Sequence, residues 1–428
     1  MKKYKEFITA VFFGLMVALF VYGASQTVVY KPFLKIQNAI DDSHFIRRFL
    51  LRGNDDQETK RIVIVDIDDR SIESLGRFKY WPRRLFAEVL GNISQDGAQV
   101  IFLDVILKEG GLHRDNRVLA DSVRTFGNVF TGYYFILDAP SIRQRPLDPV
   151  FNEELTSGML YPESIGRNHF IKAEQIVLPY IDLLHSVRGF GFTNYVPDPD
   201  GVLRHIPLYI KYEKKLYPSA SLMIWMHLNG LQSKNASITP EGLRFGDMII
   251  PTDRHCFMRL NYTGSKSVYQ TVSFVDVLER NFEPGTFNGK IIMIGSGSDE
   301  LKDLKRIPGF SAIPGVEVHA AALTTLMSGR FLRVTPGNVI LIMTVLCGMF
   351  SSVIFWYASP VRVGLPVVLG VPLVLFMYAV YCFIVQFLLV NISLPSFVIV
   401  LLYFVITTYR LIEGYENGKG EERTIGAE

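Results

Sequence analysis

Long apolar runs without charge at both ends of the chain constrain its fold more than any other feature. The 428-residue sequence carries no charged residue from Phe7 to Gln26, from Val339 to Pro360, or from Val363 to Tyr409. A helix of about 20 apolar residues crosses a bilayer, and the last run is about twice that length, so we expect it to fold back between Gln386 and Ser396. The sequence therefore predicts four transmembrane helices.

Basic residues beside these runs predict the orientation of the helices. Lys2, Lys3 and Lys5 precede the first run, Arg362 separates the second from the third, and Arg410 follows the last. By the positive-inside rule these flanks lie in the cytoplasm. A cleaved signal peptide is the alternative for the first run, but its apolar core is typically only about 7 to 15 residues long. We therefore predict a cytoplasmic N-terminus with the first span (1–30), an extracytoplasmic domain (31–337), three further spans (338–410) and a short cytoplasmic tail (411–428).

The long segment between the first two apolar runs has the pattern of an α/β domain. Short β-branched apolar runs at Ile62–Ile67, Val100–Leu103 and Ile291–Ile294 are typical of strands that are buried on both faces. Helical periodicity at Arg83–Ser94 and at Val316–Met327 favours strand–helix–strand units. Such units predict a parallel sheet.

A central section departs from this pattern. Phe190–Tyr195, Val202–Tyr212, Leu243–Ile250 and Phe257–Asn261 have the composition of strands joined by turns rich in Pro, Asp and Gly, which indicates antiparallel pairing. The predicted fold class is an α/β extracytoplasmic domain with a mainly parallel sheet and an antiparallel extension, plus four transmembrane α-helices.

Polar residues follow three of the predicted strands at the point where each strand ends. Asp66 and Asp68 follow the first, Asp104 the second and Ser296 the third. Ligands of open α/β sheets bind beyond the carboxyl ends of the strands, so we expect these side chains, with Arg83, to form a ligand pocket. Two alternatives remain open. The side chains could cap the helices that follow, or Arg83 could close the carboxylates into an ion-pair network that accepts no ligand.

The spacing of Asp66 and Asp68 is also similar to the Asp-x-Asp strand end of haloacid-dehalogenase-type phosphatases, whose first carboxylate attacks phosphorus. Arg70 stands where such an enzyme needs a small hydroxyl residue, so a periplasm-facing phosphatase is kept only as an alternative. No Cys and His spacing indicates a metal site, and no basic stripe with interleaved aromatics indicates nucleic acid. We predict a protein that is not an enzyme and has no metal or cofactor.

Several blocks of the sequence together resemble the CHASE2 domain family. They are "IVIVDIDDRSIESLG", "YWPRRLFAEVLGNISQDGAQVIFLDVIL", "GFTNYVPDPDGVLRHIPL", "YPSASL", "GKIIMIGSGSDELKDL" and "IPGVEVHAAALTTLMSG", which cover nearly all of Ile62–Gly329 in the family's order. The matching positions are Asp66, Asp68, Trp81, Pro82, Arg83, Asp104, Asp198, Asp200, Gly201, Arg204, Gly295, Asp303, Pro314, Gly315, Glu317 and His319. The chain departs from the family at Phe86, where a histidine is frequent.

The resemblance implies an extracytoplasmic sensor domain of a bacterial receptor, a class generally joined through the membrane to cyclases or kinases. The sequence after Tyr409 is too short and polar to form such an output domain. We therefore predict an inner-membrane sensor that detects a small ligand outside the cytoplasm and transmits the signal to a separate signalling or periplasmic partner. The alternative is the receptor half of a longer adenylate cyclase or kinase that is cut at Glu428.

A homodimer is expected as well, since a sensor without its own output domain signals by changing its contacts with another chain. Gly348 and Ser352 have the small-xxx-small spacing of associating transmembrane helices. The predicted partners are thus the lipid bilayer, a second copy, an unknown small ligand and an output protein, with no nucleic acid.

Overall fold

The computed structural model describes residues 2–27, 31–54, 56–108, 110, 113–137, 170–213, 215–264, 268–298 and 303–425. The chain divides into two compact units. The helical unit comprises Met1–Arg48 and Arg333–Glu428, and the α/β unit comprises Phe49–Leu332. The predicted extracytoplasmic domain, 31–337, begins earlier than the α/β unit because it includes most of helix α2 (Lys31–Arg52), and its boundaries remain a prediction.

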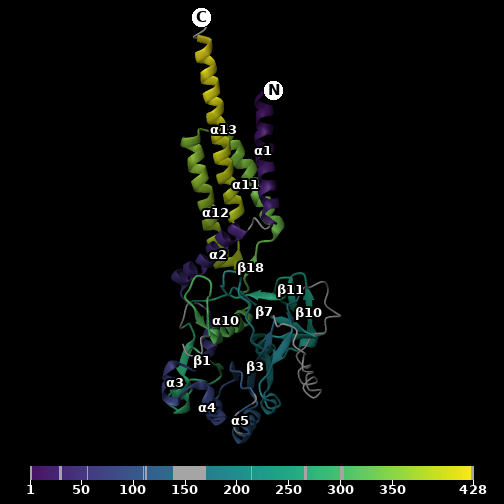
Figure 1. Cartoon of the computed structure of the whole chain (residues 1–428), viewed down its shortest axis with the longest axis vertical. Helices are drawn as coiled ribbons and strands as arrows, with labels where there is room; N and C mark the ends of the chain where they lie inside the picture. The colour runs from purple at the N-terminus through teal and green to yellow at the C-terminus, as the bar shows by residue number, and fades with distance from the viewer. Residues whose placement is uncertain are drawn as a thin grey trace. The chain divides into compact units, whose positions relative to one another are not determined.

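The helical unit contains the four apolar helices that the sequence predicts. They are α1 (Lys2–Ser25), α11 (Gly337–Tyr357), α12 (Leu365–Gln386, preceded by a π-helical turn at Pro360–Gly364) and α13 (Ser393–Ile425), and they run side by side (Figure 1). Among the described residues, four helices are long and apolar enough to cross a membrane. The chain turns between α12 and α13 at Phe387, which has a left-handed φ of 54°. The predicted position of the fold-back is therefore confirmed, while membrane insertion remains a prediction.

Small residues let α1 and α11 approach closely. A Cβ atom added at Gly14 would lie 2.4 Å from the carbonyl oxygen of Gly348. The Ser352 hydroxyl donates a hydrogen bond to the carbonyl of Ala10 at 2.7 Å. Gly348 and Ser352 thus pack one chain internally, and the self-association predicted from their spacing loses this basis.

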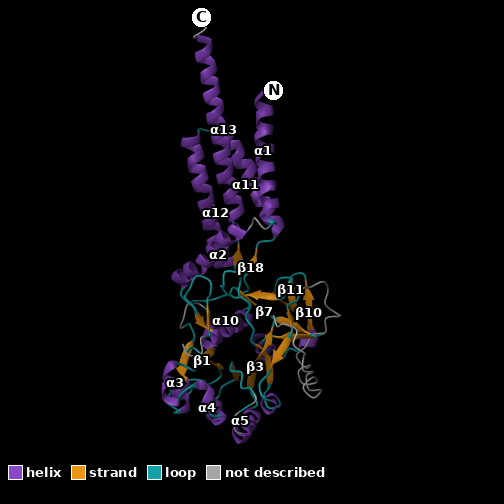
Figure 2. Cartoon of the chain, viewed as in Figure 1, coloured by secondary structure: helices purple, strands orange, loops and turns teal. Residues whose placement is uncertain are grey.

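The α/β unit mixes helices and strands throughout (Figure 2). Its helices are α3 (Asp69–Leu75), α4 (Arg83–Gln95), α5 (His113–Phe126), α7 (Ile181–Leu184), α8 (Ala220–Leu228), α9 (Phe274–Leu278) and α10 (Gly315–Ser328), with 3₁₀ turns at Gln57–Arg61, Phe78–Tyr80 and Ser233–Asn235. Its strands are β1 (Ile62–Asp66), β2 (Val100–Leu103), β3 (Val129–Ile136), β4 (Lys172–Ala173), β5 (Gln175–Val177), β6 (Gly189–Phe192), β7 (His205–Pro207), β8 (Tyr209–Tyr212), β9 (Lys215–Pro218), β10 (Ala236–Thr239), β11 (Gly242–Phe245), β12 (Met248–Pro251), β13 (Phe257–Arg259), β14 (Gln270–Ser273), β15 (Ile291–Gly295), β16 (Leu304–Lys305) and β17 (Ile313–Pro314). Strands β18 (Arg333–Val334) and β19 (Leu388–Leu389) belong to the helical unit.

A mixed sheet forms the centre of the α/β unit, in the order β14-β1-β15-β2-β3-β5 with β6 also on β3. The pairs β14–β1, β1–β15, β15–β2, β2–β3 and β3–β6 are parallel, and β3–β5 is antiparallel. The mixed α/β class is therefore confirmed. One assignment is wrong: β6, which the sequence places in the antiparallel extension, is a parallel strand of the central sheet.

Helices cover both faces of this sheet. Val63 and Val65 of β1 point with Leu103 of β2 into one core, which also holds the apolar side of α4. That side repeats at helical spacing through Phe86 and Leu90, and Pro82 precedes the first turn, where a proline suits a helix start. The alternate strand residues face α10 and α8 instead.

The antiparallel part consists of small sheets, β10-β11-β12, β13-β7 and β16-β17, together with β4-β8-β9, in which β8–β9 is antiparallel and β4–β8 parallel. The sequence predicts one strand at Leu243–Ile250, and this is wrong. Gly246, with φ of 58°, turns the chain with Asp247 so that β11 pairs with β12 as a hairpin. Glycine is favoured there because a two-residue hairpin turn requires positive φ.

Close packing of β6 on α8 predicts the effect of a single methyl group. A Cβ atom at Gly191 would lie 2.5 Å from the backbone nitrogen and Cα of Ala220. We expect Gly191→Ala to lower the free energy of unfolding by about 1 to 3 kcal/mol through overpacking, measured by denaturant unfolding of the full chain in mild detergent. Gly91→Ala on α4, where the nearest atom is 3.5 Å away, is the control and should be neutral or stabilising. Equal effects of the two substitutions would contradict this packing.

Candidate functional site

The carboxyl ends of β1, β15 and β2 meet at one edge of the central sheet. Asp66 is in register with Gly295, and the amide of Ile67 donates to the carbonyl of Gly295 at 2.8 Å. The amide of Asp104 donates to the carbonyl of Ile294, also at 2.8 Å. The structure therefore brings the ends that carry Asp66, Asp104 and Ser296 together, as the order of strands and helices predicts.

The side chain of Asp68 caps a helix. Its Oδ1 accepts hydrogen bonds from the amide and the hydroxyl of Ser71 at 2.9 and 2.6 Å, which makes it the N-cap of α3. The Ser273 hydroxyl donates to the same oxygen at 2.9 Å. Capping of this kind satisfies amides that have no partner within the helix. For Asp68 the structure thus supports the capping interpretation.

Backbone groups also bond two further residues of the predicted pocket, Asp66 and Ser296. Oδ1 of Asp66 accepts a hydrogen bond from the amide of Gly297 at 2.6 Å. The Ser296 hydroxyl donates to the carbonyl of Ile67 at 3.4 Å and accepts from the amide of Ser298 at 3.2 Å. Both side chains therefore help to shape the loop after β15.

Arg83 does not close these carboxylates into a network. Its Nη2 donates to the carbonyl of Lys108 at 3.3 Å, and among the described residues it forms no ion pair with Asp66, Asp68 or Asp104. Burial lowers the pKa of Arg83, and the nearby Tyr180 opposes this shift. The predicted ion-pair alternative is therefore absent from the described part of the chain.

Asp104 belongs instead to a group of titratable side chains near the first turn of α10. We call Asp104, Tyr195, Asp303, Lys305 and His319 the Asp104 cluster. The pKa of Asp104 is raised to about 8, mainly by burial and in part by the charge of Asp303, while Lys305 opposes the shift. The half-buried carboxyl group is therefore mostly protonated at neutral pH.

Asp303, Lys305 and Tyr195 are tied to one another and to the start of α10. Nζ of Lys305 lies 2.7 Å from Oδ1 of Asp303 and 5.1 Å from the centre of the Tyr195 ring. The Tyr195 hydroxyl donates to the carbonyl of Gly315 at 2.6 Å, and the amide of Gly315 donates to the carbonyl of Asp303 at 2.8 Å. A Cβ atom at Gly315 would lie 2.0 Å from Oδ2 of Asp303, so glycine is required for this approach.

His319, one turn further along α10, is the most deeply buried member of the cluster. Its side chain is 1% exposed, and its ring lies 4.9 Å from that of Tyr195 and 6.1 Å from that of Phe102. Neither ring nitrogen has a hydrogen-bond partner among the residues that the structure describes. Burial lowers the pKa of His319 to about 4, and the backbone of Thr193 opposes this shift without reaching hydrogen-bond geometry. Buried polar atoms without partners are rare, because each costs desolvation energy.

The sequence identified Asp104, Asp303 and His319 but missed Tyr195 and Lys305. Tyr195 lies just after β6, whose carboxyl end reaches the same edge because β6 runs parallel to β3. Because the sequence pattern assigns β6 to the antiparallel section, it does not predict that Tyr195 lies at this edge. The alternation of glycine and phenylalanine in "GFGF" was the available signal, since it fits a strand in close contact with another element.

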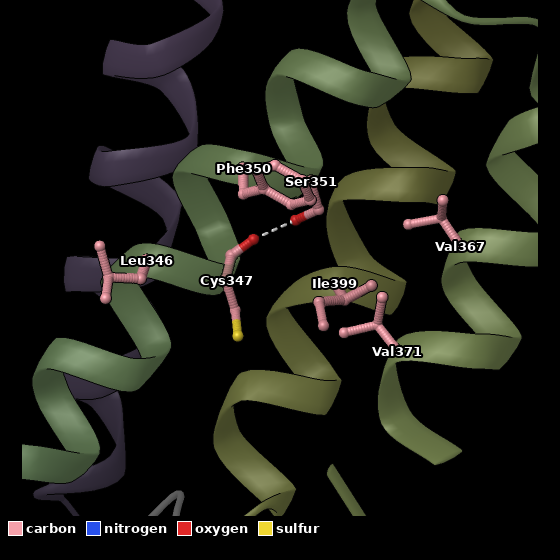
Figure 3. A pocket seen from close by; sticks show the side chains of 7 residues that line it. All are labelled: Leu346, Cys347, Phe350, Ser351, Val367, Val371 and Ile399. Atoms are coloured by element: carbon pink, nitrogen blue, oxygen red, sulfur yellow. Dashed lines mark hydrogen bonds between the residues drawn. The ribbon is translucent and has the colours of Figure 1, made fainter. Parts of the chain in front are cut away.

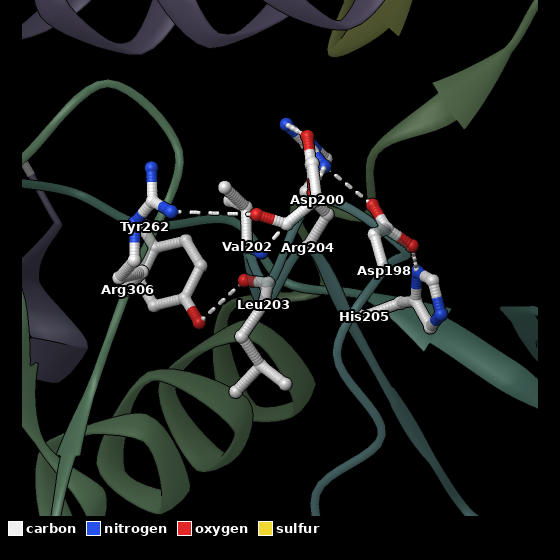
Figure 4. A network of polar contacts seen from close by, with 8 residues as sticks. All are labelled: Asp198, Asp200, Val202, Leu203, Arg204, His205, Tyr262 and Arg306. Carbon is white, nitrogen blue, oxygen red and sulfur yellow. Dashed lines mark hydrogen bonds and ion pairs between the residues drawn. The ribbon is translucent and has the colours of Figure 1, made fainter. Parts of the chain in front are cut away.

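A second polar group lies in the loop before β7 (Figure 4). Arg204 is 5% exposed; its Nη1 bonds Oδ2 of Asp198 at 2.6 Å, and its Nη2 bonds Oδ2 of Asp200 at 2.8 Å. These hydrogen bonds are the main cause that lowers the pKa of Asp200. Gly201, with φ of 79°, allows the turn in which the amide of Val202 donates to Oδ1 of Asp200 at 3.1 Å. The group is internally satisfied, which favours a structural role.

Trp81, another family position, contributes to packing. Nε1 of Trp81 donates to the carbonyl of Gly76 at 2.6 Å, and its ring lies 5.0 Å from that of Phe274. Phe86, the departure from the family, is buried in the same aromatic group, 5.3 Å from Phe274. Glu317 is buried on α10. Phe86 therefore fills the hydrophobic core and has no polar function.

The helical unit contains a groove of about 340 Å³ between α11, α12 and α13 (Figure 3). Its lining residues are Leu346, Cys347, Phe350, Ser351, Val367, Val371 and Ile399. The Ser351 hydroxyl, the one hydroxyl among them, bonds the carbonyl of Cys347. The groove thus offers a polar ligand no charged group, and it is not a candidate for the predicted site.

The buried ion-pair group predicts a large effect of removing its cation. We expect Arg204→Met to lower the free energy of unfolding by about 2 to 3 kcal/mol, because two carboxylates lose their partner. This is less than the cost for a fully buried pair, since Asp198 and Asp200 are 17% and 34% exposed. Arg124→Met is the matched control: that arginine is 59% exposed and pairs with the exposed Asp121, so its loss should cost less than about 1 kcal/mol. Denaturant unfolding of the full chain in detergent gives both values. Similar costs would contradict a buried network.

The raised pKa of Asp104 predicts how stability depends on pH. The unfolded chain releases this proton near the ordinary pKa of 3.8, whereas the folded chain keeps it up to about pH 8, so the carboxyl group destabilises the fold increasingly between these values. We expect Asp104→Asn to be more stable than the parent by about 1 to 3 kcal/mol at pH 8, and equally stable near pH 4. Thermal unfolding of both full-length proteins across this range measures the difference. A loss of stability at pH 8 would show an ionised and paired Asp104.

Comparison with protein families covers the α/β unit and part of the helical unit. The CHASE2 domain family matches residues 13–354, from within α1 to within α11. No curated protein and no solved structure gives a significant match to the chain. Because the family match covers well over half of the 428 residues, the chain belongs to the CHASE2 domain family, a family of extracytoplasmic sensor domains.

Proposed function

We propose that this protein is a bacterial inner-membrane sensor that binds a small polar ligand at the Asp104 cluster and transmits its occupancy through the four apolar helices to a partner. The single observation that carries the choice of site is His319, which is buried against Tyr195 and whose two ring nitrogens have no hydrogen-bond partner among the described residues. Tyr195 in turn interacts electrostatically with Asp104 and Asp303. A ligand with hydrogen-bonding groups would satisfy polar atoms that the protein itself leaves unsatisfied.

The chemistry of the cluster supports binding. A protonated Asp104 can donate a hydrogen bond, whereas Asp303 and Lys305 supply an acceptor and a cation within the same group. The first turn of α10 adds a partial positive charge from its helix dipole. Such a set of groups suits a ligand that carries both donors and acceptors.

Binding without turnover is part of the proposal. Phosphoryl transfer by an Asp-x-Asp pair needs one carboxylate to attack and the other to handle the leaving group's proton. Asp66 accepts the amide of Gly297, and Asp68 caps α3, so both carboxylates already have structural partners. These contacts give Oδ1 of each carboxylate a structural role, which supports binding rather than phosphoryl transfer.

Transmission requires a second binding surface. A ligand shifts an equilibrium only if it binds one arrangement more tightly than another. We include a homodimer in the proposal, formed through the α/β unit, because the small residues Gly348 and Ser352 are already used within one chain. Both termini lie in the cytoplasm in this scheme, as the basic flanks predict.

The orientation is tested with two exposed positions. Glu88 lies on α4 of the α/β unit, and Val361, 71% exposed, lies between α11 and α12. We expect a membrane-impermeant maleimide to label Glu88→Cys in intact cells stripped of their outer barrier, and Val361→Cys only after the membrane is opened. The parent chain gives the background from its own cysteines. The reverse pattern would place the α/β unit in the cytoplasm and overturn the sensor.

The site is tested by thermal-shift screening of small polar compounds against the full chain in detergent. A compound that stabilises the parent should lose its effect on His319→Phe and retain it on Arg117→Gln, an exposed position on α5. A compound that stabilises all three proteins equally binds elsewhere and contradicts the placement of the site.

A further inference from the structure

Helix α2 has an inverted pattern of burial. Its polar residues Gln37, Asp41, His44 and Arg48 recur at helical spacing and are 4, 9, 0 and 6% exposed. The opposite side of the helix carries Ile36, Ala39, Ser43, Ile46 and Leu50, again at spacings of three and four. Of these, Ile36, Ile46 and Leu50 are 54, 39 and 76% exposed. A surface helix in water has the reverse arrangement, with apolar residues inward and polar residues outward.

The polar side of α2 is held by specific contacts with the helical unit. Nε2 of Gln37 donates to Oδ1 of Asp41 at 2.7 Å and to the carbonyl of Val390 at 3.3 Å. Oε1 of Gln37 accepts hydrogen bonds from the amides of Ile392 and Ser393, both at 3.2 Å. One side chain thus bonds three residues of the turn between α12 and α13.

Aromatic rings of α12 cover the next part of the polar side. The His44 ring lies 5.5 Å from the ring of Phe383 and 5.8 Å from that of Phe376. The guanidinium groups of Arg47 and Arg48 lie over Phe376 and Phe383 at 4.8 and 5.0 Å. The inward placement of these polar groups is therefore part of the packed structure.

The position along α12 indicates the depth of α2. A crossing of about 20 residues that starts at Pro360 ends near residue 380, and α2 contacts α12 and the following turn from Phe376 to Ser393. These contacts span the level at which the hydrocarbon region would end. The apolar side of α2 is therefore at the same depth as the outer end of the lipid-facing surface of the spans.

We propose that α2 lies in the outer interface of the bilayer, with the stripe of Ile36, Ala39, Ile46 and Leu50 against acyl chains. Lipid explains the inversion, since polar groups avoid it and apolar side chains do not. The charges of α2 are consistent with this placement. Among its described side chains, the exposed charged ones are Lys35 and Arg52, and both are cations, which suit lipid phosphate groups. The part of α12 that α2 contacts also exposes apolar side chains: Met377, Tyr381 and Val385 are 60, 54 and 46% exposed.

This inference depends on the membrane insertion proposed above, and the test separates the two. In the full chain with Cys347→Ser, single nitroxide labels are placed through Ile36→Cys, Ile46→Cys, Leu369→Cys and Glu88→Cys. The proteins are reconstituted in vesicles of phosphatidylethanolamine and phosphatidylglycerol. Collision rates with oxygen, which concentrates in lipid, and with a nickel chelate, which stays in water, are then measured at each label.

We expect the oxygen-to-chelate ratio at Ile36 and Ile46 to approach that at Leu369 and to exceed that at Glu88 several-fold. Lipid-like values at Leu369 with water-like values at Ile36 and Ile46 would overturn the inference and leave the membrane proposal intact. Water-like values at all four labels would overturn both. Low access to both reagents at Ile36 and Ile46, with dipolar broadening between labels, would show that a second copy covers the stripe, and would also overturn the inference.

Discussion

The close approach of α10 to the end of β15 is the contact on which the candidate site depends. A Cβ atom at Gly295 would lie 2.5 Å from Cβ of Val316, so the first turn of α10 can reach this edge only because residue 295 is glycine. Gly295 is in register with Asp66, and Asp104 follows the neighbouring strand. The same turn of α10 is bonded by Tyr195 and by the backbone of Asp303. The contact between Gly295 and Val316 thus brings the start of α10 to the strand ends that carry the candidate site.

The strands that carry Asp66 and Asp104 could be predicted because both are short, uninterrupted apolar runs that end in an acid. Whether each aspartate would cap a helix or remain in the candidate site could not be predicted from sequence spacing. Asp68 has a serine three residues later and becomes a cap, whereas Asp104 is followed by no helical turn and keeps its carboxyl group for the cluster. Capping depends on where the next helix begins, and that is decided by packing against α9 and β14.

The presence of Tyr195 and Lys305 in the candidate site could not be predicted, for a different physical reason. The place of Tyr195 follows from sheet order, since β6 joins β3 in parallel although segments around it pair antiparallel. The place of Lys305 follows from the pairing of β16 with β17, which precedes α10. Pairing partners are long-range properties, and alternation within one strand does not specify them. The hairpin of β11 and β12 was missed for a local reason. Gly246, at positive φ, divides into two strands a segment whose pattern predicts a single strand.

Both connections between the α/β unit and the helical unit are hydrogen-bonded to the same turn of the helical unit. The first connection is α2, within which the chain passes from Arg48 of one unit to Phe49 of the other, and its Gln37 bonds the amides of Ile392 and Ser393. The second is the segment after Leu332, in which the amides of Arg333 and Thr335 donate to the carbonyls of Phe387 and Leu389 at 2.8 and 3.0 Å.

The turn between α12 and α13 is therefore hydrogen-bonded to both connecting segments, although the first of them, α2, lies far from it in sequence. A displacement of α2 or of β18 must lengthen hydrogen bonds to this turn or move it, because the amides and carbonyls involved are already paired. Movement of the turn would in turn displace the ends of α12 and α13, since it joins them directly. Within the helical unit, the turn that joins α12 and α13 is thus hydrogen-bonded to both segments that continue into the α/β unit, and it is covalently linked to two of the four apolar helices.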